Sequence, residues 1–364
     1  MYVTRRAQCA AHPSAIAWPI MSRRLPAFSV IIPTHNRCAL VLRAIDSVLG
    51  NAEVGEVEVI VVDDGSTDAT TRVVQETHPH DARVRTLRSA LNEGPSGARN
   101  RGLAAATGDL ILFLDSDDLL LPHALAFAGA AFQQCPELQF LTLEGEATSL
   151  VEHTFEQGIV RKRNPGWRGE GFTADLLQKR SLDPPAGVRS SPRVLEVGNL
   201  FPAIVFGDLF FLSGVVIRRQ AALASGPFNL RYRFLEDWDF TARLCLSGMG
   251  GYLDYVGFHR ETGRADQLGR VGTPWRRALM HQHILTTVRA TGRVDTIESR
   301  LLLRRAQAAA DYWLGRCLLE QRHDHLARTY LTRSLRRAYK PVKSLVWLIA
   351  GQRLARTPRY LSTP

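Results

Sequence analysis

Short apolar runs alternate with amphipathic stretches through the first third of the chain. Four runs rich in β-branched and aromatic residues have the length of buried strands: residues 28–32, 57–62, 84–87 and 110–114. Between them, apolar residues recur at helical spacing, as at Leu42, Ile45 and Leu49. Strands that alternate with helices in this way predict an α/β fold, Rossmann-like, with a mostly parallel sheet covered by helices on both faces.

The pattern weakens in residues 144–202, which are rich in Arg, Gly and Pro. We expect a loop or lid there, with a helix near residues 172–179. Order returns with a predicted strand at 210–217 and a helix after Leu235, and from about Pro274 onward the pattern is helical. The pattern therefore predicts a disordered extension over 1–25 and a first domain over 26–270, with halves at about 26–145 and 146–270. A basic helical region follows over 271–364.

Charge is concentrated at the end of the chain. The 364 residues carry a net charge of +11, and the stretch from Arg289 onward holds 16 Lys and Arg against 5 Asp and Glu. Such a region predicts an anionic partner surface, either lipid headgroups or nucleic acid, unless it is simply a solvated helical face. The apolar run at 344–350 is far shorter than the ~18 residues that cross a bilayer. Five scattered cysteines without a Cys-x-x-Cys pair favour a reducing, cytoplasmic compartment.

Polar residues follow three of the predicted strands, at 33–37, 63–66 and 115–118. Ligands of open α/β sheets bind at the carboxyl ends of the strands, so we expect these residues to share one site. Carboxylates that neighbour each other on one turn repel unless a cation or solvent lies between them. Oxygen ligands on a short turn suit Mg²⁺ or Mn²⁺, which also bridge phosphates. Without the preceding strand, the acidic turn would be more typical of a solvated turn or helix cap.

Four segments together resemble the ordered motif set of the family 2 glycosyltransferases. They are FSVIIPTHNR at 28–37, VVDDGSTD at 61–68, GARNRG at 97–102 and LDSDD at 114–118. The resemblance covers roughly residues 28–250 and implies the GT-A fold. It implies a metal-dependent, inverting hexosyltransferase that moves a sugar from a nucleotide-sugar, with a UDP-sugar expected, to a hydroxyl of a saccharide or lipid-linked acceptor. Enzymes of this kind build surface polysaccharides and glycolipids.

The resemblance also assigns roles to individual residues. Thr34 and Asp64 would contact the base and ribose, with Asp63 nearby, and Arg99 would line the base side. Asp117 would bind the Mg²⁺ or Mn²⁺ ion, while Asp115 would face the ribose or the metal. The full set of expected donor contacts is Pro33, Thr34, Asn36, Asp63, Asp64, Arg99, Asp115 and Ser116. Asp118 is expected to cap a helix.

The pair Glu236 and Asp237 resembles the acceptor-side Glu-Asp pair of the family. Asp237 is the expected general base, which removes the proton of the acceptor hydroxyl. Asp239 is the local competitor, and Glu236 or Asp239 could instead only cap the helix.

Four residues have open alternatives. Glu236 and Trp238 are candidate acceptor contacts, although an aromatic residue that opens a helix is more often part of the core. His259 and Arg260 are candidates for a diphosphate or metal contact, with a structural role equally open.

Two other functions would explain part of this pattern. Sugar nucleotidyltransferases use a Gly-rich phosphate loop after the first strand, and residues 33–37 contain no glycine. A catalytically inactive domain that binds a membrane or another partner is disfavoured by the retained carboxylates Asp64, Asp115, Asp117 and Asp237. For the basic tail, the resemblance favours an anionic membrane surface over nucleic acid, which places a cytoplasmic protein peripherally on the inner face of the cell membrane.

Overall fold

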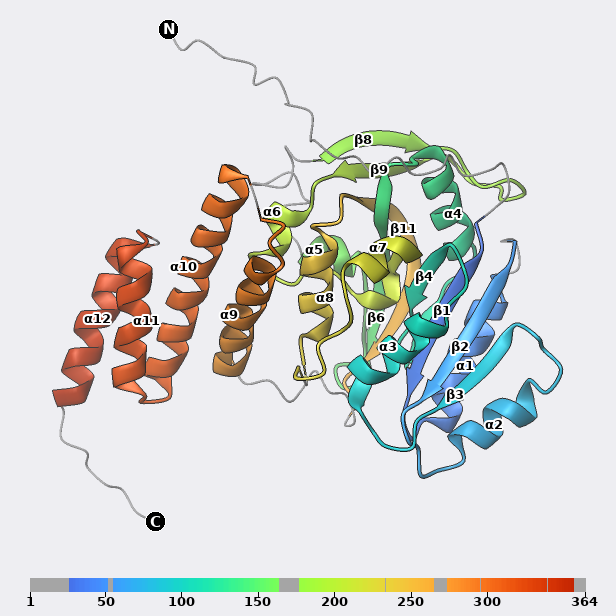
Figure 1. Ribbon diagram of the computed structural model, residues 1–364, viewed down its shortest axis with the longest axis horizontal. Coiled ribbons are helices and arrows are strands. Elements are labelled where there is room, and N and C mark those ends of the chain that lie inside the picture. Colours follow the sequence, from blue (N-terminus) through green and yellow to red (C-terminus); the bar gives the residue numbers. More distant parts are fainter. Residues whose placement is uncertain are drawn as a thin grey trace, which may run out of the picture.

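The computed structural model describes residues 26–51, 55–163, 177–232, 234–264, 274–294, 296–338 and 340–356. It is an α/β body built on one large sheet, with a row of C-terminal helices beside it (Figure 1). The expected extension over 1–25 lies outside the described residues, as do residues 164–176 of the expected loop between 144 and 202.

The first four strands form the parallel part of the sheet, in the order β3-β2-β1-β4. They are β1 (Phe28–Thr34), β2 (Val57–Asp63), β3 (Val84–Arg88) and β4 (Leu110–Phe113). The helices between them are α1 (Cys38–Leu49), α2 (Thr70–Thr77) and α3 (Gly94–Ala105). Right-handed crossovers place α1 and α2 on one face and α3 on the other, because the chain reverses direction across the sheet after β3. This confirms the predicted α/β class.

Beyond β4 the sheet becomes mixed. Strand β10 (Val215–Arg218) runs antiparallel between β4 and β6 (Leu138–Ser149), and β6 pairs in parallel with β11 (Met249–Thr262). The remaining strands are β5 (Asp118–Leu120), β7 (Thr154–Gln157), β8 (Leu177–Leu182) and β9 (Arg193–Gly198). The other helices before residue 265 are α4 (Ala124–Gln134), α5 (Ile159–Arg163), α6 (Phe201–Ile204), α7 (Arg219–Ala224) and α8 (Glu236–Leu244).

Two local predictions in this half were wrong. The described end of the helix expected at 172–179 belongs to strand β8, which pairs with β9, so sheet pairing overrides the local pattern. The strand expected at 210–217 begins only at Val215, after a 3₁₀ turn at Leu212–Gly214. That turn changes the chain direction so that Ser213 faces the end of the sheet where β4 terminates.

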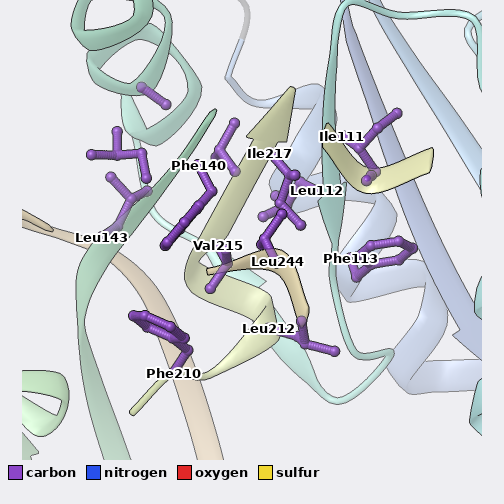
Figure 2. Close-up of a cluster of buried hydrophobic side chains, with 14 of the residues drawn as sticks. Ile111, Leu112, Phe113, Phe140, Leu143, Phe210, Leu212, Val215, Ile217 and Leu244 are labelled. Atoms are coloured by element: carbon purple, nitrogen blue, oxygen red, sulfur yellow. The ribbon is translucent and has the colours of Figure 1, made fainter. Parts of the chain in front are cut away.

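The core joins the parallel and mixed parts of the sheet. Figure 2 shows Ile111, Leu112 and Phe113 of β4 beside Val215 and Ile217 of β10, with Phe140 of β6 beyond them. Helix α3 approaches the sheet closely at Gly102, where an added Cβ would lie 2.3 Å from Cγ2 of Ile31. This close contact brings the start of α3 to the carboxyl ends of β1 and β2.

Four helices complete the described chain: α9 (Pro274–Ala290), α10 (Ile297–Glu320), α11 (Asp324–Arg336) and α12 (Pro341–Arg356). Each packs against the next, and α9 also packs against α8 (Figure 1). Ile284, Leu285 and Leu303 belong to the main core, whereas Leu314 and Leu331 belong to a separate, smaller core. The first of these helices is therefore continuous with the sheet domain. Among the described helices, none is both long and apolar enough to cross a membrane.

Candidate functional site

A cavity of about 740 Å³ opens where β1, β2 and β4 end. Its walls come from those strand ends, from the first turn of α3, from the segment 208–213, from the start of α8, from β11 and from α9. This is the place where open α/β sheets bind their ligands. It brings together Thr34, Asp64, Asp115, Asp117 and Asp237, which are separated by up to two hundred residues in the sequence.

The end of β1 supplies Pro33, Thr34 and Asn36 to the cavity wall. Thr34 is 3% exposed, and its Oγ1 has no hydrogen-bond partner among the described residues. Asn36 has a left-handed backbone with φ of 53°, and its Oδ1 accepts a hydrogen bond from the Thr67 amide at 2.8 Å. The Asn36 side chain thus holds the turn against Thr67, and the buried Thr34 hydroxyl makes no hydrogen bond within the described residues.

The two aspartates at the end of β2 have different surroundings. The Asp64 carboxylate lines the cavity and accepts hydrogen bonds from the amides of Glu93 and Gly94, at 3.0 and 2.7 Å. Asp63 is fully buried, accepts from the Ser66 amide at 2.8 Å and from the Thr71 hydroxyl, and is not among the lining residues. Asp64 therefore joins the cavity to the start of α3, and Asp63 organises the loop that follows β2.

Each carboxylate of the acidic turn, residues 115–118, lies against a different arginine. Asp115 pairs with Arg99 at 2.8 Å and Asp117 with Arg37 at 3.1 Å, and Arg37 also donates to Ser116 Oγ at 3.3 Å. Burial opposes ionisation of Asp115, but Arg99 outweighs it and keeps the pKa of that carboxyl below its usual value. The pKa of Asp117 is raised by burial and by repulsion from Asp115, which Arg37 only partly offsets.

The sequence predicted that Asp118 caps a helix, and this prediction was wrong. It begins strand β5, is 2% exposed, and accepts a hydrogen bond from Ser213 Oγ at 2.6 Å. Burial raises its pKa to about 7, although Arg260 lies 3.4 Å away and acts in the opposite direction. The antiparallel pairing of β5 with β11 places Arg260 directly across from Asp118.

The cavity carries more acidic than basic groups. Seven carboxyl side chains and four guanidinium groups line it. In the part of the chain that the structure describes, no cluster of three or more His, Cys, Asp or Glu side chains could enclose a metal ion by itself. An excess of negative charge around two neighbouring carboxylates, Asp115 and Asp117, nevertheless fits a divalent cation that completes its coordination with ligand oxygens and water.

The start of α8 forms the wall that includes the predicted base. Arg99 bridges Asp115 and Glu236, with a distance of 2.8 Å to each. Asp237 lines the cavity, and its Oδ1 accepts a hydrogen bond from the Trp238 amide at 2.8 Å. Within the described residues, no lysine or arginine lies within ion-pair distance of Asp237. Its carboxylate is therefore available to a substrate hydroxyl.

Of the other candidates on α8, Asp239 and Trp238 face the interior, and only Glu236 lines the cavity. Asp239 is fully buried and pairs with Arg243 at 2.7 Å, so it does not reach the cavity. Trp238 is 6% exposed, and its Nε1 donates to the Ile204 carbonyl at 2.8 Å. This position favours the alternative that Trp238 belongs to the core. Glu236 lines the cavity but is held by Arg99.

The two basic candidates on β11, His259 and Arg260, also differ in whether they line the cavity. Arg260 lines the cavity, where it pairs with Asp118, whereas His259 pairs through Nδ1 with Glu146 at 3.1 Å and is not among the lining residues. Neighbouring residues of a strand point to opposite faces, so only one of the two can face the site.

Several lining residues were not among the predicted site residues. Arg37 stood within the first motif, but its contact with Asp117 depends on the pairing of β1 with β4. Asp208, Phe211 and Ser213 come from a segment with weak periodicity, and Arg277 comes from α9. No sequence signal links these residues to the acidic turn.

Comparison with known proteins identifies the family. The sequence profile described as "Glycosyl transferase family 2" matches residues 29–134. A "PGL/p-HBAD biosynthesis glycosyltransferase" of Mycobacterium tuberculosis is 31% identical over 227 residues, which are 61% of this chain and 70% of that protein. The "GalNAc(5)-diNAcBac-PP-undecaprenol beta-1,3-glucosyltransferase" of Campylobacter jejuni is 43% identical over 158 residues, 43% of this chain and 45% of that protein.

Solved structures share the fold over nearly the whole chain. TarS 1–349 of S. aureus in complex with UDP-GlcNAc superimposes with a TM-score of 0.54 and 17% identity, over 92% of this chain and 93% of that one. The fold likeness extends through the C-terminal helices. With its motif order, its cavity at the strand ends and these relatives, the chain belongs to glycosyl transferase family 2 and has the GT-A fold.

Proposed function

We propose that this glycosyltransferase moves a hexose from a nucleoside-diphosphate sugar, a UDP-sugar, to a hydroxyl of a saccharide or lipid-linked acceptor with inversion at the anomeric carbon. The observation that carries the proposal is the placement of the acidic turn, residues 115–118, in the same cavity as Asp237. Of the similar proteins, TarS is described in complex with UDP-GlcNAc, and the Campylobacter relative is named as acting on a diphosphate-linked undecaprenol.

The nucleotide would bind against the ends of β1 and β2. Thr34 and Asp64 line this part of the cavity beside Pro33 and Asn36, and the buried Thr34 hydroxyl has no partner among the described residues. A buried hydroxyl without a partner costs free energy, which a hydrogen bond to the base or ribose would recover. Arg99 would contribute indirectly, by holding Asp115 and Glu236 in place.

Asp117 and Asp115 would hold Mg²⁺ or Mn²⁺. Two carboxylates together with phosphate oxygens and water form a common site for these ions. When bound, the ion neutralises charge on the departing diphosphate. A Pyrobaculum calidifontis mannosyltransferase, similar to this chain with a TM-score of 0.50 and 17% identity, is described in complex with GDP-Man and Mn²⁺.

Asp237 would act as the general base. It lines the cavity at the start of α8 and carries no ion pair within the described residues, while its competitor Asp239 faces the core. A carboxylate in this position can take the proton of the acceptor hydroxyl as that hydroxyl attacks the anomeric carbon. One displacement without a protein nucleophile inverts the configuration.

Nucleotide binding tests this proposal directly. Calorimetric titration with UDP, GDP and dTDP in the presence of Mn²⁺ should identify one tight ligand, and Mn²⁺ should tighten its binding. In Asp117→Asn the metal-dependent part of the affinity should disappear, together with sugar transfer. Asp46→Asn is the matched control, because Asp46 lies on the exposed side of α1. Unchanged Mn²⁺ dependence in Asp117→Asn would disprove the metal assignment.

The last helix suits a peripheral membrane contact. Val342, Leu345 and Val346 of α12 are exposed at 74, 49 and 57% and share one helical face, with the exposed Lys343 close by. An exposed apolar face bordered by cations is typical of helices that lie in the interface of an anionic membrane. Leu345→Asp should reduce co-sedimentation with anionic liposomes, whereas Leu326→Asp, at an equally exposed leucine of α11, should not. Equal pelleting of both variants would contradict this contact.

A further inference from the structure

Helix α9 brings one residue of the C-terminal helices into the cavity. Arg277, the fourth residue of α9, is exposed and lines the cavity together with Asp237 and Arg260. It lies far outside the residues matched by the family profile, which end at position 134. Its neighbour Arg276 is also exposed, but its guanidinium lies over the Trp275 ring and it is not among the lining residues. The two adjacent arginines thus have different surroundings.

Two aromatic side chains in tilted contact join α9 to α8, the helix that carries the proposed base. The rings of Trp238 and His281 lie 4.4 Å apart between centroids. Trp238 Nε1 donates to the Ile204 carbonyl and His281 Nε2 to the Val205 carbonyl, each at 2.8 Å. Both side chains are buried, so two successive carbonyls of one segment hold a ring from α8 and a ring from α9. We call Trp238 and His281 the aromatic clamp.

The clamp lies one helical turn from Arg277 on α9. Arg277 precedes His281 by four residues, so the two side chains project from the same face of α9. Trp238 directly follows Asp237 at the start of α8. Burial lowers the pKa of His281 to about 4, so the ring is neutral at physiological pH and keeps its donor on Nε2. The buried end of this face is therefore rigidly attached, one turn away from a guanidinium at the cavity rim.

We propose that Arg277 binds a phosphate group of the substrate and that the aromatic clamp positions it at the cavity rim. The inference rests on the proposed function, since the phosphate belongs either to the nucleotide-sugar donor or to a lipid-linked acceptor. A guanidinium matches phosphate oxygens in charge and in its planar pair of donors. The two arginines differ in exposure: Arg277 is exposed, and Arg99, which pairs with Asp115 and Glu236, is 5% exposed. Arg277 is exposed and lines the cavity wall.

The test compares ligands with and without phosphate. The nucleoside diphosphate that binds the wild-type protein best among UDP, GDP and dTDP, and the matching nucleoside, are titrated into wild type, Arg277→Gln and Arg276→Gln. Farnesyl diphosphate, as a short lipid diphosphate, is titrated into the nucleotide-saturated proteins. Arg277→Gln should weaken the binding of one of the two diphosphates by about tenfold, as expected for a lost charge-assisted hydrogen bond. The affinity for the nucleoside should stay unchanged. Arg276→Gln should change neither.

Each outcome has a distinct meaning. Loss of nucleoside diphosphate affinity assigns Arg277 to the donor, and loss confined to farnesyl diphosphate assigns it to the acceptor. Suppose that the wild-type protein binds a nucleoside diphosphate and that Arg277→Gln binds both diphosphates with wild-type affinity. The inference is then wrong, while the proposed function stands. If the wild type binds none of the three nucleotides, the proposed function fails, and the inference fails with it.

The clamp is tested as a positioning device. His281→Leu should weaken binding of the same diphosphate as Arg277→Gln does and leave the affinity for the nucleoside unchanged. The double variant should lose little further affinity. A general loss of stability would instead weaken nucleoside and diphosphate alike. That equal loss, or additive losses in the double variant, would overturn the role of the clamp.

Discussion

Arg99 is a buried cation that joins two walls of the cavity. Its guanidinium lies 2.8 Å from both Asp115 and Glu236, and so connects the acidic turn to the start of α8. It also faces the Phe228 ring at 5.5 Å from the ring centroid. Replacing Arg99 by Met preserves much of the side-chain volume but leaves two carboxylates without their shared partner. We expect this substitution to be strongly destabilising.

The magnitude follows from the burial of the three side chains. Removal of one partner of a buried ion pair costs about 3–5 kcal/mol, because the remaining charge stays desolvated. The Glu236 side chain is 11% exposed and Asp115 is 32% exposed, so Glu236 should account for most of the loss. Burial already raises the pKa of Glu236 even with Arg99 present. Without Arg99 the pKa of Glu236 should rise further. The loss of unfolding free energy should be greatest at pH values above this pKa, where Glu236 is charged. It should shrink as the pH falls below this pKa.

Urea unfolding followed by circular dichroism at pH 8 and pH 5 measures this loss. Arg101→Met is the matched control on the same helix, because Arg101 and its partner Glu93 are exposed at 36 and 47%, and such pairs contribute about 1 kcal/mol or less. Adding Glu236→Gln to Arg99→Met should recover at least about 1 kcal/mol, since it removes the stranded charge. If Arg99→Met unfolds like Arg101→Met, or if its loss is the same at both pH values, the buried bridge does not have the role described.

Three further predictions concern the base, the clamp and the packing of α3. Asp237→Asn should lower kcat by about 10²–10⁴-fold in a sugar-transfer assay and leave nucleotide affinity unchanged; retention of more than a tenth of wild-type kcat would exclude Asp237 as the base. The pKa of His281 is depressed from 6.5 to about 4 by burial, so its neutral ring favours folding above pH 6.5, and that contribution, about 3 kcal/mol, is lost as the pH falls toward 4. His281→Leu should therefore show a flatter dependence of unfolding free energy on pH across this window than wild type, and parallel curves would refute the burial argument. Gly102→Ala should cost about 1–3 kcal/mol in urea unfolding, because its methyl group would meet the Ile31 side chain; an unchanged midpoint would show that α3 can move away from the sheet.

Local pattern was sufficient where local interactions decide the structure. The strands that become β1 to β4 were predicted because each is a short apolar run that ends at polar or turn residues, and a buried parallel strand needs little more. The residues of the acidic turn were found in the same way, because strand ends of a parallel sheet meet at one edge. Within the acidic turn, however, the sequence did not show which role each carboxylate has. Asp118 reads as a helix cap, yet it begins a strand, because its partner β11 lies more than a hundred residues later.

What the sequence by itself determined is the α/β class, the order of the family motifs and the carboxylates available for chemistry, since these follow from residue type and short spacing. The tertiary structure alone decided which arginine faces each carboxylate, and that Asp237 lines the cavity while Asp239 and Trp238 face the interior. It also brought Arg277 to the same cavity through the packing of α9 on α8. These contacts join segments distant in the chain, and their geometry depends on how the core packs, which short-range periodicity does not encode.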